Sequence, residues 1–155
     1  MAPFGSSRPW FRNIDFMDQV ANQTFIMCKP DAVERGLVGE IISRIEQKGF
    51  SIVKMDQRVP TRALAEAHYE EHSDKPFYGE LVDFLSRGPV VAMVVEGPSD
   101  NTFAVMRTLI GKTRVDDAQP GSIRGDFATS TNENLVHGSD AHESAAREIL
   151  LWFPS

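Results

Sequence analysis

The sequence has little of three things that would place it in a special class of protein. Its single cysteine, Cys28, rules out a disulfide within the chain and gives no sign of an oxidising compartment. Its longest apolar run, residues 89–95, is much shorter than the roughly 20 residues that cross a bilayer as a helix. Basic residues are outnumbered, with 16 Lys and Arg against 22 Asp and Glu and a net charge of −6. We therefore expect a cytoplasmic protein whose partners are neither membranes nor nucleic acids, because no chain-wide positive field attracts a polyanion.

The first residues also lack the apolar block of a secretory signal peptide. Residues 1–16 mix Pro, Gly, Ser, Arg and aromatic side chains without a pattern. A chain of 155 residues that is 41% hydrophobic suits one compact domain with a buried core. We expect residues 1–19 to be a flexible N-terminal extension and residues 20–155 to form a single domain.

The apolar pattern predicts short strands and helices along the chain. Apolar runs predict strands at residues 24–28, 50–59, 89–95 and 134–138. Helical spacing predicts helices at residues 39–48, 77–86, 99–110 and 140–151, with one more that begins at Thr61. Pro30 predicts a loop after the first strand, residues 112–132 read as a long loop, and Asp140 with Glu143 predicts the cap of the last helix.

This order of elements indicates an α+β fold. When the helical hairpin between the second and third strands is set aside as an insert, the order is βαββαβ. That order is typical of a ferredoxin-like sandwich with a four-stranded antiparallel sheet. The fold alone says little about activity, since it hosts many.

His137 lies at the end of a predicted strand and just before the last helix, with Gly138 and Ser139 following it. A neutral imidazole in such an exposed setting can act as a nucleophile or a base. The plainer interpretation, a half-buried histidine that bonds a nearby loop, is the more common one and is favoured by the residues alone.

Basic residues stand at the ends of predicted elements and in the long loop, where they can converge on one anion. They are Lys29, Arg107, Lys112, Arg114 and Arg124, with the hydroxyl of Thr113 among them. Arg offers a planar pair of donors to phosphate oxygens, and Lys offers a point charge. Each one taken alone is better explained as a solvated surface charge, so only a shared pocket would make them a phosphate site.

Two familiar nucleotide and metal motifs are excluded. Residues 111–113 (GKT) match the end of a Walker A loop, but Met106 stands where its first glycine is required, and no G-x-G-x-x-G occurs. His68 and His72 are one helical turn apart without the glutamate of a zinc-protease motif, so we expect no protein-held metal.

Three further side chains have both a plain and a functional interpretation. Tyr69 and Phe77 are most simply packing residues of the helical insert, and the alternative is a wall for a nucleobase. Glu148 falls on the last helix, where a solvated face is the plain interpretation.

Several blocks, taken together and in this order, resemble the nucleoside diphosphate kinase family. They are residues 29–31 (KPD), 35–40 (RGLVGE), 88–93 (GPVVAM), 120–127 (PGSIRGDF) and above all 134–140 (NLVHGSD). The likeness covers about residues 23–153, and so many separate blocks make it far more specific than any one short motif.

The resemblance implies ping-pong phosphoryl transfer between nucleoside triphosphates and nucleoside diphosphates, with broad base specificity and Mg²⁺ as cofactor. It implies that His137 is the nucleophile that becomes phosphohistidine, and that Tyr69, Glu148 and Ser139 flank or orient it. By the same resemblance, the nucleotide-binding residues are Lys29, Arg107, Thr113 and Arg124 for the phosphates, Lys29 and Asn134 for the ribose, and Phe77 with Leu81 for the base.

The resemblance also implies a homo-oligomer built from dimers, with a hexamer favoured over a tetramer. The chain departs from the family pattern at residues 113–115 (TRV), where many members have Thr-Asn-Pro, and it has no longer C-terminal tail. Two other hypotheses are a non-catalytic nucleotide-binding module and a nucleic-acid-binding protein of the same fold. The intact set of site residues argues against the first, and the acidic balance against the second.

Overall fold

The computed structural model describes residues 16–154 and contains a four-stranded antiparallel sheet. The strands are β1 (Gln23–Cys28), β2 (Ser51–Arg58), β3 (Val90–Glu96) and β4 (Val136–Gly138). The helices are α2 (Pro30–Glu34), α3 (Val38–Gln47), α4 (Arg62–His68), α5 (Tyr78–Leu85), α6 (Thr102–Ile110), α7 (Ile123–Phe127) and α8 (His142–Trp152). The spatial order of strands is β2-β3-β1-β4, which confirms the predicted ferredoxin-like α+β fold.

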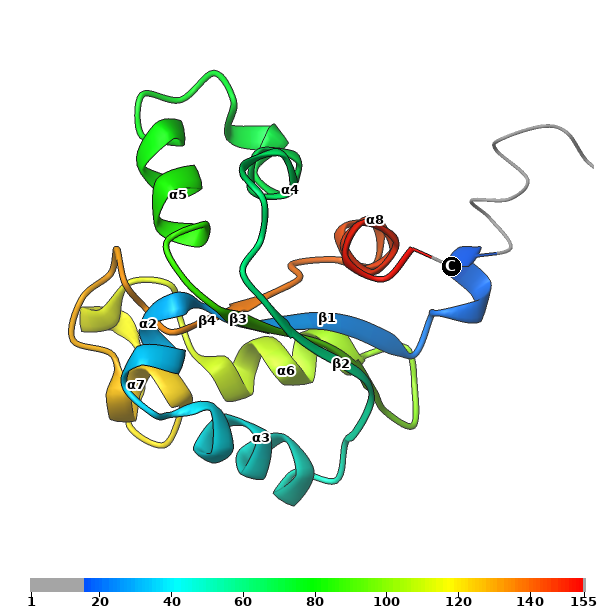
Figure 1. Cartoon of the computed structure of the whole chain (residues 1–155). Helices are drawn as coiled ribbons and strands as arrows, with labels where there is room; N and C mark the ends of the chain where they lie inside the picture. Colours follow the sequence, from blue (N-terminus) through cyan, green and yellow to red (C-terminus); the bar gives the residue numbers. More distant parts are fainter. Residues whose placement is uncertain (1–15, 155) are drawn as a thin grey trace, which may run out of the picture.

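Helices cover both faces of this sheet (Figure 1). On one face, Ile26 and Cys28 of β1 pack with the apolar sides of α3 and α6. On the other face, Phe25 and Met27 pack with α4, α5 and α8, and Trp152 is fully buried there. Because β1 and β3 are buried on both sides, their sequences are continuous apolar runs rather than alternating ones.

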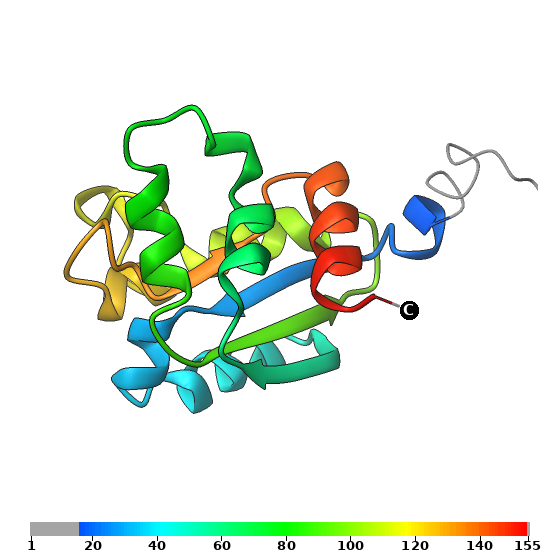
Figure 2. The same ribbon diagram turned by 45° about the horizontal axis from the view of Figure 1, so that its top comes forward.

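The helical insert stands above the sheet as a separate hairpin. Helix α4 begins where predicted, since Thr61 Oγ1 accepts the backbone N–H of Leu64 and caps it. Helix α5 follows after a 3-10 turn at Glu70–His72, and the two helices rise together from the side of the sheet that carries α8 (Figure 2).

The structure corrects several predicted boundaries. Pro30 does not open a loop, because it occupies the first turn of α2, where its missing N–H costs nothing. The presumed loop at residues 112–132 contains a 3-10 turn at Val115–Asp117 and helix α7. Strand β4 is shorter than predicted because Leu135 has a φ of 76°, which interrupts the extended backbone.

The ends of two helices also differ from the sequence prediction. Helix α6 begins at Thr102 rather than Ser99. At α8, the expected partner of Asp140 was Glu143, but Ser144 takes that place. Its hydroxyl bonds Asp140 at 2.6 Å and accepts the N–H of Ala141 at 3.0 Å.

Residues 16–19 form a helical turn before β1, and Phe16 and Val20 pack against the core beside α8. The rest of the predicted extension, residues 1–15, lies outside the described residues. Within residues 16–154, none of the helices has the length and apolarity that a membrane span requires.

Candidate functional site

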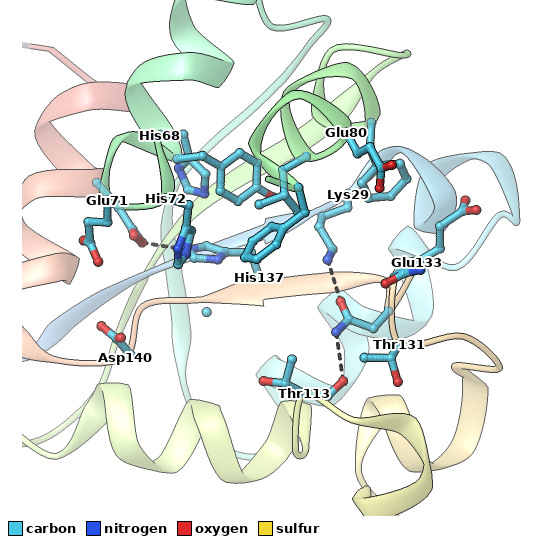
Figure 3. A pocket seen from close by; sticks show the side chains of 18 of the residues that line it. Lys29, His68, Glu71, His72, Glu80, Thr113, Thr131, Glu133, His137 and Asp140 are labelled. Carbon is cyan, nitrogen blue, oxygen red and sulfur yellow. Dashed lines mark hydrogen bonds and ion pairs between the residues drawn. The ribbon is translucent and has the colours of Figure 1, made fainter. Parts of the chain in front are cut away.

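A pocket of about 780 Å³ opens between the helical insert and the segment that leads from α7 into β4. This volume is in the range of sites that hold small molecules. Figure 3 shows its lining, with side chains from the insert on one side and from β4 and the loop after α6 on the other. The pocket therefore joins parts of the chain that are far apart in the sequence.

Cationic side chains lie at the inner end of the pocket. Lys29 follows β1, Arg107 is an exposed residue of α6 and Arg124 lies on α7. Lys29 and Arg124 are 8% and 6% exposed, so both charges are largely removed from water. Buried cations with spare donors are a suitable lining for an anion.

Lys29 donates through Nζ to the side-chain oxygen of Asn134, which in turn donates to the backbone oxygen of Thr113 at 3.1 Å (Figure 3). Burial and the nearby Arg124 lower the pKa of Lys29 to about 8, although Asp31 and Glu133 oppose this shift. Lys29 is therefore a lysine whose charge can be lost in mildly alkaline solution.

Arg124 is fixed by backbone carbonyl groups rather than by a carboxylate. Its guanidinium donates to the oxygens of Gly111, Asn134 and Val136. Burial and Arg107 lower the pKa of Arg124 to about 10, so the side chain is charged at neutral pH. Arg107 is held by the oxygen of Gly138 at 3.1 Å, directly after His137.

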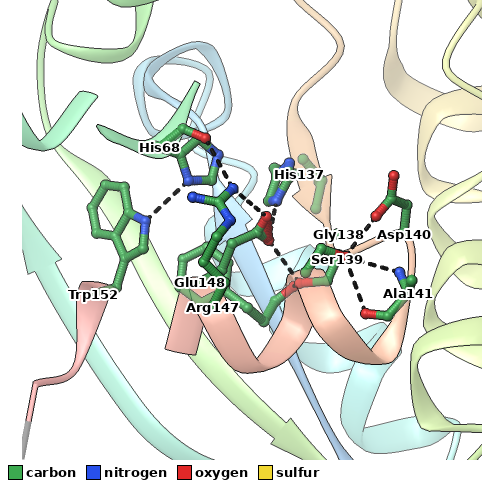
Figure 4. A network of polar contacts seen from close by, with 12 residues as sticks. His68, His137, Gly138, Ser139, Asp140, Ala141, Arg147, Glu148 and Trp152 are labelled. Atoms are coloured by element: carbon green, nitrogen blue, oxygen red, sulfur yellow. Dashed lines mark hydrogen bonds and ion pairs between the residues drawn. The ribbon is translucent and has the colours of Figure 1, made fainter. Parts of the chain in front are cut away.

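His137 lies in β4 at the floor of the pocket, and its Nε2 is 2.7 Å from Glu148 Oε1 on α8 (Figure 4). Ser139 donates its hydroxyl to the same carboxylate oxygen at 2.7 Å. Burial alone would raise the pKa of Glu148, but His137 and the hydrogen bond from Ser139 outweigh burial and hold that pKa below its usual range. An ionised carboxylate only accepts, so Nε2 carries a proton, and in the neutral form of the ring the lone pair is on Nδ1.

A second histidine packs against the first. The ring of His68 lies edge-on to that of His137 with centroids 4.6 Å apart, and Trp152 Nε1 donates to His68 Nδ1 at 3.1 Å (Figure 4). Burial, then the charge of His137, lowers the pKa of His68 to about 3. His68 is therefore a neutral residue. Tyr69 lies next to it, and burial, with Glu148 and Asp31, raises the pKa of its phenol to about 12.

His68, His137 and Glu148 are close enough for one metal ion, because their ligand atoms lie within 4.8 Å of one another. His68 and Glu148 are already engaged in hydrogen bonds, and only Nδ1 of His137 keeps an unused lone pair. Nδ1 of His68 accepts a hydrogen bond from Trp152, and Glu148 Oε1 accepts hydrogen bonds from His137 and Ser139. The chemistry of this cluster therefore fits the orientation of an imidazole better than the binding of a metal.

The helical insert contributes an apolar surface to the pocket. Phe77 is 44% exposed, and Leu81 and Phe84 on α5 continue its surface inward. The ring of Phe84 also lies under Lys29 Nζ, 5.6 Å from its centroid. An exposed aromatic face beside buried cations suits a ligand with a flat apolar end and an anionic end.

The structure brings ten of the eleven residues named by the family resemblance into the lining of this one pocket, and places the eleventh, Ser139, behind it on Glu148. Lys112 and Arg114 are not part of the lining, and Arg114 instead pairs with Asp116 on the surface. Sequence reasoning missed several other lining residues, among them Phe84, Arg87 and Thr131. Phe84 lies one turn after Leu81, so helical spacing could have found it, whereas Arg87 and Thr131 carry no local signal.

Comparisons with known proteins agree with one another. The family model described as nucleoside diphosphate kinase matches residues 22–155. A nucleoside diphosphate kinase of Exiguobacterium sibiricum is 60% identical over 131 residues, which is 84% of this chain and 94% of that protein. One of Corynebacterium jeikeium is 56% identical over 137 residues, 88% of this chain and 99% of that protein. The crystal structure of a nucleoside diphosphate kinase family protein from Babesia bovis has a TM-score of 0.82 at 46% identity, and covers 86% of this chain and 88% of that one.

The neutral state of His68 predicts a pH dependence of stability. Between its ordinary pKa of 6.5 and its folded pKa of about 3, the unfolded chain binds more protons at this residue than the folded chain does. Stability should therefore fall as the pH falls through this window, by up to about 1.4 kcal/mol per pH unit. His68→Asn, whose side-chain oxygen can accept the proton of Trp152, should lose about 2 kcal/mol less than the parent between pH 7 and pH 5.

The measurement is urea denaturation of both proteins at pH 7, 6 and 5. Only the change in the free energy of unfolding with pH is compared between the two proteins, so a constant loss of stability in the variant does not matter. An equal pH dependence in the two proteins would show that the pKa of His68 is not lowered in the folded protein.

Proposed function

The chain belongs to the nucleoside diphosphate kinase family and has that activity, and from this premise we propose that the transferred phosphate passes through His137. In the first half-reaction, Nδ1 of His137 attacks the γ-phosphorus of a nucleoside triphosphate. The bond to the bridging oxygen breaks, and the nucleoside diphosphate leaves with that oxygen. In the second half-reaction, the terminal oxygen of another diphosphate attacks the phosphorus of the phosphohistidine. The P–N bond to Nδ1 breaks, which forms the new triphosphate and regenerates His137.

The observation that carries this proposal is the hydrogen bond between His137 Nε2 and Glu148 Oε1. The buried carboxylate fixes the ring and its tautomer, so the lone pair lies on the nitrogen that Glu148 does not use. It also stabilises the positive charge that the ring gains when Nδ1 forms a bond to phosphorus. Ser139 keeps the carboxylate in place, since it donates to the same oxygen.

We assign Lys29, Arg107, Thr113 and Arg124 to the phosphates and Asn134 with Lys29 to the ribose. Phosphoryl transfer needs mainly positioning and neutralisation of the charge on the phosphate oxygens. The burial of Lys29 and Arg124 supports these roles, because their charges are weakly screened by water. Tyr69 lies beside His68 in the pocket lining, and we assign its hydroxyl as a donor to the transferred phosphate.

Members of this family use a divalent cation, which we propose is Mg²⁺. The donor set at the inner end of the pocket is cationic, so it fits phosphate oxygens and a metal ion that those phosphates carry. The hydrogen bond from Ser144, with a smaller effect of the charge of Arg107, lowers the pKa of Asp140, and this carboxylate in the pocket lining is available to such an ion. When bound, the ion neutralises charge on the phosphate oxygens.

We propose further that residues 20–155 are the catalytic domain and that the enzyme works in the cytoplasm. The family match at residues 22–155 supports the first point, and a chain that begins at residue 16 would test it. Fractionation of cells that produce the protein would test the second.

The labelling experiment uses ATP with a labelled γ-phosphate and Mg²⁺, followed by GDP. We expect an acid-labile, alkali-stable phosphoenzyme whose label is chased into GTP, and a strong loss of labelling when EDTA removes the metal. The same result is expected from a chain that begins at residue 16. If His137→Ala is labelled as well as the parent, the mechanism is wrong.

The base should bind against Phe77 and Leu81 by stacking, without donors for a particular base edge. Phe77→Ala should therefore weaken the binding of ADP, GDP and CDP by a similar factor, equivalent to about 1 to 3 kcal/mol. Leu150→Ala on α8, also an exposed apolar side chain but outside this pocket, is the control and should leave all three affinities unchanged. A loss confined to one base would contradict broad specificity.

We also propose a homo-oligomer built from dimers through β2, with a hexamer favoured. Strand β2 is an edge strand among the described residues, and its Val53 and Met55 are 43% and 57% exposed. Apolar side chains on a free edge favour pairing with a second strand. A symmetric dimer would place two copies of this edge against each other.

Met55→Glu should therefore reduce the mass of the particle in sedimentation velocity, because it places two carboxylates in the proposed interface. Ala104→Glu, an exposed position on α6, is the control for an added surface charge. A parent that sediments as a monomer, or a Met55→Glu variant with the mass of the parent, would exclude β2 as the dimer contact.

A further inference from the structure

Leu135 has the only left-handed backbone among the non-glycine residues that the structure describes, with a φ of 76°. A left-handed conformation is unfavourable for a residue with a β-carbon, and Leu135 is fully buried. Both polar groups of its backbone are bound by the junction between β1 and α2. Its oxygen accepts the N–H of Lys29 at 2.8 Å, and its N–H donates to Asp31 Oδ2 at 3.0 Å.

The residues on either side of Leu135 position the cations of the pocket. Asn134 receives the ammonium of Lys29 on its side chain and the guanidinium of Arg124 on its backbone oxygen. Val136 provides a second backbone oxygen to Arg124. The bond from Leu135 to Asp31 therefore fixes the segment on which Lys29 and Arg124 both depend.

Asp31 has a second feature that its bond to Leu135 does not explain. The residue is 4% exposed, and its Oδ1 has no hydrogen-bond partner within the described part of the chain. A buried carboxylate with an unbonded oxygen costs free energy unless its charge is compensated. The compensation comes from Lys29 and Arg124, since the charge of Asp31 acts on both of them.

We propose that Asp31 is a positioning residue for the phosphate site, which holds the Leu135 turn with one oxygen and supplies the buried negative charge behind Lys29 and Arg124. This proposal rests on the assignment of those two cations to the phosphates. Asp31 is not part of the pocket lining, so it acts on a ligand only through its neighbours.

The charges around Lys29 make this role measurable. Arg124 on α7 opposes the charged form of Lys29, while Asp31 on α2 and Glu133 before β4 favour it. Glu133 is bound to Arg87 at the exposed rim, so its effect is screened by water. From the elements packed nearby, Phe84 on α5 presents an uncharged ring, and His68 on α4 is neutral.

Other neighbours of Asp31 stay uncharged across the useful pH range. Burial raises the pKa of the Cys28 thiol to about 12, and the pKa of Tyr69 is also about 12. The pKa of Lys29 is about 8, so its protonation is the change expected between pH 7 and pH 9. Loss of the charge of Asp31 should move that change to lower pH, because the cation would lose its buried counter-charge.

Asp31→Asn separates the two roles, because its amide oxygen can still accept the N–H of Leu135 but carries no charge. The measurement is calorimetric titration with ADP from pH 6 to pH 9. We expect the affinity of Asp31→Asn to be within twofold of the parent at pH 6, and about fivefold weaker at pH 8, as for a lysine pKa lowered by about one unit. Asp31→Ala should bind weakly at every pH and melt at a lower temperature, since the Leu135 N–H loses its partner.

Glu34→Gln is the matched control, because it removes a carboxylate from the same helix α2 at an exposed position that bonds Arg87. Its titration curve should follow that of the parent. If the affinity of Asp31→Asn for ADP falls over the same pH range as that of the parent, or if the variant differs from the parent only in melting temperature, the proposal is wrong.

Lys29→Met distinguishes this failure from a failure of the proposed function. It should bind ADP weakly and without an alkaline loss of affinity. If Lys29→Met instead binds ADP as the parent does, the phosphate assignment of Lys29 is wrong, and the role of Asp31 with it.

Discussion

A carboxylate that is 4% exposed must find its hydrogen bonds within the protein, and Glu148 finds them on residues 137 and 139. This constraint ties α8 to β4 and sets the direction of the His137 ring. Once the ring is fixed, the remaining nitrogen is the one group of the imidazole that is free for a ligand. The packing of His68 and Trp152 on the same side completes the enclosure, because a second, neutral ring fills the space into which His137 could turn.

At the opposite end of the site, the main interaction is the repulsion between the positive charges of Lys29 and Arg124. Lys29 and Arg124 are buried close together, and the structure holds them apart from water with neutral oxygens of the backbone and of Asn134. Neutral oxygens satisfy the donors but leave most of the positive charge uncompensated. An anionic ligand therefore completes the electrostatics of the folded protein, while Asp31 reduces the repulsion in its absence. The unusual backbone of Leu135 is tolerated because hydrogen bonds from two sides hold it.

Local pattern in the sequence was enough for most of the fold, but only for part of the site. Strands β1 and β3 are buried on both faces, so their apolar runs were evident. Helix α7 was missed because its five residues include Gly125, and its start depends on Ser122, whose hydroxyl accepts the N–H of Gly125. The bond between Lys29 and Asn134 joins residues 105 positions apart, which no spacing rule reaches. The family resemblance named ten residues of the pocket lining, yet it indicated neither the neutral His68 beside His137 nor the buried Asp31 behind Lys29.

The use of one nucleotide pocket for both substrates would have a consequence for how such an enzyme works among mixed nucleotides. Donor and acceptor would use the same aromatic wall and the same cations, so they cannot be bound at once and must take turns at one histidine. A diphosphate that enters before the histidine is loaded therefore blocks the donor, and an excess of acceptor slows the exchange it is meant to complete. The half-reactions break and form bonds of the same kind, so little free energy is lost in either direction. The ratio of triphosphate to diphosphate in each pool, rather than any property of the site, would then decide which way the phosphate moves.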